Sequence, residues 1–165
     1  MRGDFYQGLH SRLSAKPRLV RGIAAATRGL PGVVYCAYPG MLLYLAFTGS
    51  PRLLRCLLVP AAGFLLVTVL RGALNFPRPY EVLGIPPLVD KRTKGKSFPS
   101  RHAACGAVIA VTALYVLPGL GAGLWVVSAL IALTRVLSGV HFVRDALAGL
   151  GLGALVGIIG MGLIP

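Results

Sequence analysis

A short polar stretch, from Thr134 to Asp145, lies between two strongly apolar segments and contains Arg135, His141 and Asp145. An ionisable side chain at membrane depth is costly, so we expect these residues to serve a function. If the chain is helical from residue 140 onward, His141 and Asp145 lie one turn apart on the same face. The carboxylate could then accept the proton of one imidazole nitrogen and leave the other nitrogen free as a nucleophile. A proton relay or a structural hydrogen bond would use the same pair, so the residues alone leave these alternatives open.

Two earlier stretches combine groups that bind anions. In the first, Arg71 and Arg78 stand on either side of a turn, where their guanidinium groups could bind phosphate oxygens through paired hydrogen bonds. Arginines at a helix end could equally reach lipid headgroups. The second stretch has the pattern of a helix start, with Ser100 as the N-cap and free N–H groups that attract anions. His102 in its first turn could protonate a leaving oxygen, or could be an interfacial histidine without a catalytic role.

The composition is typical of an integral membrane protein. Hydrophobic residues make up 56% of the 165 residues and charged residues only 13%. The 17 Lys and Arg residues against 4 Asp and Glu give a net charge of +13, which in a soluble protein would suggest nucleic acid. Here the basic residues lie between apolar segments, so we expect a bilayer and a phosphorylated lipid as partners, and no nucleic acid. Because carboxylates are so few, the polar groups favour an anion over a divalent metal, and we expect no metal and no cofactor.

Apolar segments of nearly spanning length predict an all-α fold, a multi-pass transmembrane bundle of about five helices. The expected helices cover approximately residues 30–47, 53–74, 101–117, 120–137 and 140–164, the third being short for a span. Gly149, Gly153 and Gly157 recur at every fourth position of the last helix. Small residues at that spacing allow a neighbouring backbone to approach closely.

The N-terminal part of the chain is basic and interrupted. We expect residues 1–29 to form an interfacial helical segment, with a flexible tail as the alternative, and residues 30–165 to form the transmembrane domain. Because the long loop 75–100 joins two spans, the polar groups near its two ends lie at the same membrane face. The chain then crosses the membrane twice more, so the stretch 134–145 returns to that face. Five spans put the N-terminal segment there too, so the positive-inside rule favours a cytoplasmic site.

Taken together, the three polar stretches resemble the signature of the type 2 phosphatidic acid phosphatase (PAP2) superfamily, in particular its small bacterial membrane lipid phosphatases. That signature is a basic residue, six residues and Arg-Pro; then Pro-Ser-Gly-His; then Ser-Arg, five residues, His, three residues and Asp. Over residues 53–160 the chain matches its order and spacing with Arg71, Arg78-Pro79, Pro99-Ser100-Arg101-His102, Thr134-Arg135, His141 and Asp145. Arg71 and Thr134 replace the common lysine and serine but keep the charge and the hydroxyl. The larger departure is Arg101 in place of glycine, which removes backbone freedom and adds a phosphate-binding fork.

The resemblance implies a PAP2-like core and a metal-independent phosphatase that hydrolyses a lipid phosphate or lipid pyrophosphate. In that scheme His141 attacks phosphorus and forms a phosphohistidine, Asp145 orients it, and His102 protonates the leaving group. The phosphoryl oxygens would be held by Arg71, Arg78, Ser100, Arg101 and Arg135. Phosphatidic acid, phosphatidylglycerol phosphate and polyprenyl phosphates or pyrophosphates all fit. Many bacterial relatives are thought to act at the outer face, which opposes the charge bias.

Two other functions are compatible with the sequence. A small non-enzymatic transporter or scaffold could use a structural intramembrane His–Asp pair, but it would not require His102. Alternatively, the phosphoryl group could pass from histidine to an alcohol instead of water.

Overall fold

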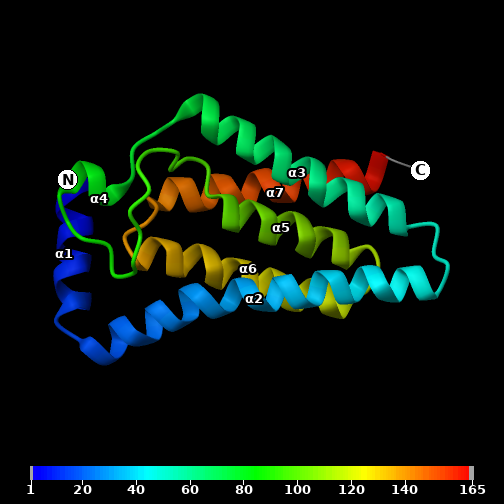
Figure 1. Ribbon diagram of the computed structural model, residues 1–165, viewed down its shortest axis with the longest axis horizontal. Helices are drawn as coiled ribbons and strands as arrows, with labels where there is room; N and C mark the ends of the chain where they lie inside the picture. Colours follow the sequence, from blue (N-terminus) through cyan, green and yellow to red (C-terminus); the bar gives the residue numbers. More distant parts are fainter. Residues whose placement is uncertain (1, 164–165) are drawn as a thin grey trace.

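The computed structural model describes the backbone of residues 2–163 and the side chains of residues 6–162. Within that range all regular secondary structure is helical, which confirms the predicted fold class. Figure 1 shows the long helices running side by side, with the first helix of the chain lying across one end of the bundle. The helices are α1 (Arg2–Ser14), α2 (Pro17–Phe47), α3 (Leu53–Leu74), α4 (Pro79–Leu83), α5 (Arg101–Leu114), α6 (Pro118–Leu137) and α7 (Val143–Leu163).

Four stretches of the described residues are long and apolar enough to cross a membrane: Pro17–Phe47, Leu53–Leu83, Pro118–Leu137 and Val143–Gly162. The remaining long helix, α5, has 14 residues and ends at Leu114 instead of near residue 117. At 1.5 Å per residue it measures about 21 Å, less than the hydrocarbon thickness of about 30 Å. It is shielded, because α2, α3, α6 and α7 all pack against it. The prediction of about five spans therefore resolves into four full spans around a short central helix.

Close packing of α5 against α7 depends on the glycine repeat. A Cβ added at Gly149 would lie 2.5 Å from the carbonyl oxygen of Ser100, and one at Gly157 would lie 2.7 Å from Val111. A Cβ at Gly153 would collide with the carbonyl of Ala104. The predicted close approach of a neighbouring backbone is confirmed, and it fixes the start of α5 against the start of α7.

The N-terminal region differs from the sequence-based expectation. The first spanning helix begins at Pro17 and not near Leu30, and α1 is a separate helix that ends at Ser14. Proline at the first turn is favourable because the missing N–H would be unpaired there in any case. The interruptions that suggested a boundary are exposed arginines on α2, such as Arg21 and Arg28. With 31 residues, α2 is about 46 Å long, so its basic first turns can extend beyond the hydrocarbon.

The last helix also begins later than expected. Gly139 adopts a φ of +72° after the end of α6, a left-handed conformation that glycine tolerates. The chain then turns through His141 and enters α7 only at Val143. The expectation of a helix from residue 140 is therefore wrong, and its expected end at residue 164 lies outside the described residues.

Candidate active site

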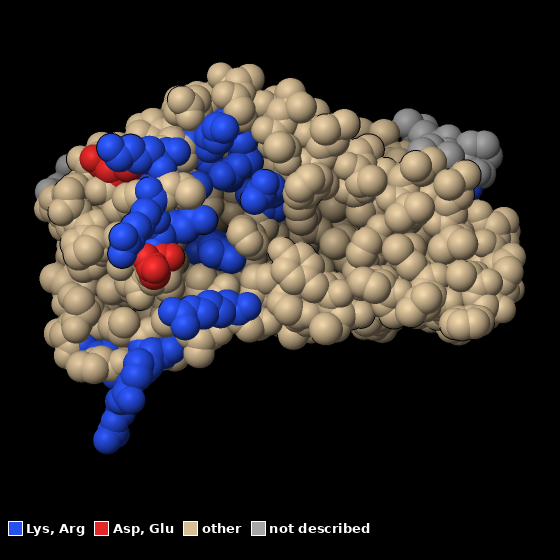
Figure 2. All heavy atoms as spheres, viewed as in Figure 1, with Lys and Arg blue, Asp and Glu red and all other residues tan. Residues whose placement is uncertain are grey.

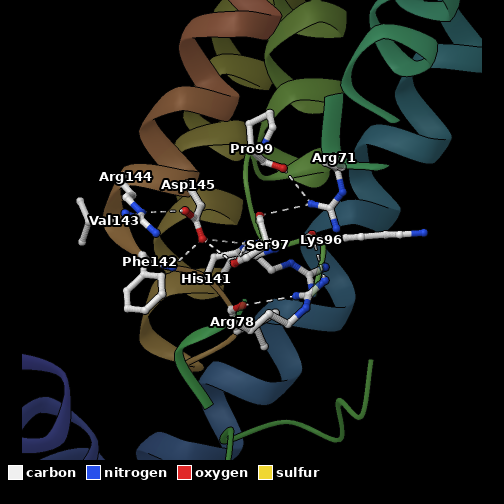
Figure 3. A network of polar contacts seen from close by, with 12 residues as sticks. Arg71, Arg78, Lys96, Ser97, Pro99, His141, Phe142, Val143, Arg144 and Asp145 are labelled. Carbon is white, nitrogen blue, oxygen red and sulfur yellow. Dashed lines mark hydrogen bonds and ion pairs between the residues drawn. The ribbon is translucent and has the colours of Figure 1, made fainter. Parts of the chain in front are cut away.

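Basic side chains gather at the end of the molecule where α1 and α4 lie (Figure 2). The close-up in Figure 3 shows that polar residues from separate elements point toward one another at this end. They come from the end of α3, the residues before α4, the loop before α5 and the connection from α6 into α7. The topology expected from the sequence placed the same segments together.

The centre of the site is a buried histidine beside a buried carboxylate. His141 is 3% exposed and Asp145 is fully buried, and their Nδ1 and Oδ2 atoms are 3.6 Å apart. The two residues do not share a helical face, since His141 precedes α7. Instead, Asp145 in the first turn of α7 reaches back, and its Oδ2 accepts the N–H of Phe142 at 3.1 Å. This contact caps the helix and places the carboxylate next to the imidazole.

Ser97 completes this pair, and the sequence analysis missed it. Its hydroxyl donates to Asp145 Oδ2 at 2.5 Å and lies 3.4 Å from His141 Nδ1. Serine in an irregular loop carries no pattern that would single it out. Together Ser97 and Asp145 occupy the Nδ1 side of the ring, and His141 Nε2 makes no hydrogen bond within the described residues.

Burial lowers the pKa of His141 to about 4, and the positive charges of Arg78 and Arg71 act in the same direction. The nearby carboxylate of Asp145 opposes this shift. The imidazole is therefore neutral at neutral pH, which is the form that can act as a nucleophile.

Two of the predicted phosphate-binding arginines are held by backbone carbonyls of the loop before α5. Arg71 donates to the carbonyl oxygens of Pro99 at 2.7 Å and Ser97 at 3.4 Å. The Arg78 guanidinium donates to three carbonyl oxygens at 3.0, 3.3 and 3.5 Å, those of Gly95, Val140 and Lys96. Arg78 is only 4% exposed, which excludes the alternative that it extends outward to lipid headgroups. Both cations are thus fixed in place before any ligand binds.

Buried polar atoms without partners mark the remaining wall of the site. Ser100 is the N-cap of α5 as predicted, but its side chain makes no cap hydrogen bond, and its Oγ is buried and unpaired within the described residues. Arg135 donates from Nη2 to the carbonyl oxygen of Thr27 at 3.4 Å, while its buried Nε has no partner in the same part of the chain. Unpaired buried polar groups are rare in proteins and usually have a ligand or a water molecule as partner.

Arg101 and His102 lie at the start of α5, beside an apolar groove. The groove has a volume of about 480 Å³ and runs between α2, α3 and α5, where it is lined by Tyr35, Tyr38, Leu57, Pro60, Phe64 and Ile109 among others. Both Arg101 and His102 also line it. The Arg101 guanidinium stacks over Phe64, with Cζ 5.6 Å from the ring centroid, and so differs from the arginines held by carbonyls.

Lys91 lies in the loop before α5, among other basic residues. Lys91 is half-buried, unlike the exposed Lys94 and Lys96. Burial lowers the pKa of Lys91, and so do the positive charges of Arg78, Arg135 and two further arginines of the site. Lys91 therefore faces the same cluster. Among the described residues, no group of three or more His, Cys, Asp or Glu is placed to hold a metal ion.

The chain belongs to the PAP2 superfamily, whose model matches residues 52–165. It is similar to the crystal structure of Aquifex aeolicus LpxE, with 24% identity and a TM-score of 0.75 over 96% of this chain and 93% of that one. It is also similar to a transmembrane PAP2 type phosphatidylglycerolphosphate phosphatase from Bacillus subtilis, with 26% identity and a TM-score of 0.68 over 97% and 84% of the two chains. A comparison with curated proteins gives no match. The family and these likenesses confirm the resemblance and support a multi-pass membrane lipid phosphatase.

Proposed function

We propose that the protein hydrolyses the phosphate ester or pyrophosphate of a membrane lipid through a phosphohistidine on His141, without a metal ion. The surroundings of His141 give this proposal its main support. His141 is neutral, its Nδ1 side is occupied by Asp145 and Ser97, and its Nε2 is left free among fixed arginines. A neutral imidazole with one nitrogen oriented and the other free is an activated nucleophile.

In the first step, His141 Nε2 attacks phosphorus and the bond to the leaving oxygen breaks. Charge on the phosphoryl oxygens is stabilised by donors that need little rearrangement, because Arg71 and Arg78 are already held by carbonyls. Ser100 Oγ and Arg135 Nε would gain the partners that they lack. Asp145 stabilises the positive imidazole ring that attack produces.

His102 is the proposed general acid. It lies in the first turn of α5 and lines the groove beside the site. Once it has protonated the leaving oxygen, the same side chain can accept a proton from the water that attacks the phosphohistidine. That second step releases inorganic phosphate and restores both histidines. An alcohol in place of water would give phosphoryl transfer.

The groove beside the site supports a lipid as substrate. His102 and Arg101 lie at one end of it and apolar residues line the rest, so a phosphate near His102 could continue into a hydrocarbon chain between α2, α3 and α5. Arg101 would reach the phosphate by leaving Phe64. Phosphatidic acid, phosphatidylglycerol phosphate and polyprenyl phosphates or pyrophosphates are the candidates to screen.

The membrane face of the site is open to a direct test. Basic residues at the site end favour the cytoplasmic face by the positive-inside rule, whereas the resemblance to bacterial relatives favours the outer face. A cysteine introduced at the exposed Lys94, in a chain without its native cysteines, can be labelled in intact cells with a membrane-impermeant reagent. Labelling places the site outside, and protection that is lost on cell lysis places it inside.

The function itself is tested by phosphate release from the candidate lipids by purified protein in detergent containing a chelator. We expect release by the native chain and none by His141→Ala or His102→Ala. A non-enzymatic transporter or scaffold would release no phosphate from any of them. Release of phosphate that persists in both variants would refute the proposed mechanism.

A further inference from the structure

A row of stacked side chains runs along the outside of the catalytic pair. Tyr6 of α1 contacts Phe142 edge to face, with ring centroids 5.2 Å apart. The Arg144 guanidinium lies between two rings, with Cζ 5.3 Å from Phe142 and 5.6 Å from Phe76. Phe76 in turn contacts Phe98 edge to face at 5.7 Å. Each of the three phenylalanines is within two residues of His141, Arg78 or Ser100, so the row joins the segments that build the site.

Arg144 occupies the centre of this row and also faces the catalytic carboxylate. Its Nε is 3.5 Å from Asp145 Oδ1. A dashed line marks this ion pair in Figure 3. Asp145 Oδ2 already receives hydrogen bonds from Ser97 and Phe142, whereas Oδ1 is buried and has no hydrogen bond within the described residues. The guanidinium is thus the ion-pair partner of the carboxylate oxygen that the rest of the site leaves unpaired.

The sequence gives no local reason for an arginine at this position. Residue 144 is in the first turn of α7, where the helix dipole disfavours a positive charge. Its side chain is 53% exposed at a helix end, where an arginine could reach lipid headgroups, yet its guanidinium lies beside Asp145. The cost is offset by the contacts with Asp145 and the two rings, which indicates that the charge serves the neighbouring pair.

We infer that Arg144 is a positioning residue: it holds the outer oxygen of Asp145 and fixes the start of α7 against the segments before α4 and α5. This inference rests on the proposed function. With Oδ1 held, Oδ2 stays directed at Ser97 and His141 Nδ1. Without the guanidinium, the carboxylate can rotate toward solvent or draw a proton onto His141, and either change removes the competent nucleophile.

The test compares Arg144→Met and Arg144→Lys with the native chain, using a short-chain lipid phosphate in detergent so that bilayer binding does not contribute. For Arg144→Met we expect kcat to fall about tenfold and KM to change less than about twofold, because a displaced nucleophile slows the chemical step. Arg144→Lys keeps the charge but loses the planar stack, so its kcat should lie between the two. Arg92→Met is the matched control, since Arg92 forms an exposed ion pair with Asp90 at 3.4 Å, and it should behave as the native chain.

The pH profile separates positioning of the charge from packing alone. Removing the cation leaves Asp145 unopposed, which favours protonated His141, so the acid limb of kcat/KM in Arg144→Met should move up by about half a pH unit. The other charged and titratable groups around His141 stay the same in all variants; they are Arg71, Arg78, Lys91, Arg101, His102 and Arg135. Arg144→Lys keeps the positive charge and should keep the native acid limb of kcat/KM. A shift of the acid limb in Arg144→Lys would speak against an electrostatic role.

Several results would overturn the inference. Native kcat and a native acid limb in Arg144→Met would show that the guanidinium does not position the pair. A rise in KM alone would indicate contact with the substrate headgroup instead. If Arg144→Met does not fold, judged by its melting temperature and elution in detergent, Arg144→Gln carries the same prediction. A native chain that releases no phosphate would refute the proposed function as well, whereas an active native chain with an unaltered Arg144→Met refutes only the positioning role.

Discussion

Ser97→Ala is the substitution that most sharply tests how His141 is activated. It removes one hydroxyl from a fully buried position and leaves the Ser97 backbone carbonyl, which accepts a hydrogen bond from Arg71. The lost contacts are the 2.5 Å hydrogen bond to Asp145 Oδ2 and the 3.4 Å approach to His141 Nδ1. Asp145 keeps the N–H of Phe142, so the substitution loosens the carboxylate without freeing it.

The size of the effect follows from the kind of bond that is lost. A hydrogen bond to a charged group contributes about 1.5–3 kcal/mol. Since about 1.4 kcal/mol corresponds to a factor of ten in rate, full loss in the transition state would lower kcat about 10- to 100-fold. The carboxylate can shift toward Nδ1, 3.6 Å away, and form a direct hydrogen bond that recovers part of this loss. We therefore expect a decrease of about tenfold, near the lower bound.

The assay is the initial rate of phosphate release from a lipid phosphate in detergent, together with the single-turnover rate of phosphohistidine formation. Ser128→Ala is the matched control, because Ser128 is equally buried but its hydroxyl donates to Leu124 within α6. It should keep native kinetics. Native kcat in Ser97→Ala would refute the view that this serine holds the carboxylate and imidazole together.

Four further predictions follow from the same geometry. His141→Ala and His102→Ala should lower kcat at least about 10³-fold, while His10→Ala, the third histidine, should retain most activity; loss of activity in all three would point to unfolding instead. Because the pKa of His141 is lowered to about 4, its imidazole stays neutral above that pH. We therefore expect kcat/KM, corrected for ionisation of the substrate, to fall only as the pH drops through about 4. An acid limb of kcat/KM near the ordinary histidine pKa of about 6.5 would contradict this. Gly149→Val should lower stability by at least about 1–3 kcal/mol, seen as a lower melting temperature, because its Cβ would lie 2.5 Å from the Ser100 carbonyl; Gly151→Ala, with nothing within 4 Å of its Cβ, should not. Prolonged treatment with a chelator should leave kcat unchanged, and activity restored by an added divalent metal would count against a metal-independent reaction.

The sequence predicts helices well where an apolar run has clear ends. The second predicted span coincides with α3, because Arg52 and Asn75 bound a largely apolar stretch and Asn75 takes the left-handed conformation that ends the helix. The start of α2 is mispredicted because exposed arginines resemble a boundary, although a helix longer than the bilayer tolerates them. At Gly139 the turn into α7 delays the helix past His141, and the periodicity of the surrounding residues does not reveal it.

Some residues of the candidate site can be found from the sequence, and others cannot. Spacing within each polar stretch makes His102, His141 and Asp145 candidates, and the fold places His141 beside Asp145. Ser97 and Arg144 could not be identified this way, since their importance comes from contacts between segments that only the fold brings together. The predicted proximity of His141 and Asp145 is found, but a reversed helix-capping contact produces it instead of a shared helical face.

The central claim is that His141 becomes covalently phosphorylated, and mapping the phosphoryl group tests it most directly. The purified protein is incubated with a lipid phosphate labelled in the phosphoryl group, quenched in alkali, where phosphohistidine survives, and analysed by mass spectrometry. We predict label on His141, absent from His141→Ala and present in His10→Ala. Label on another residue, or steady phosphate release from His141→Ala, would contradict it.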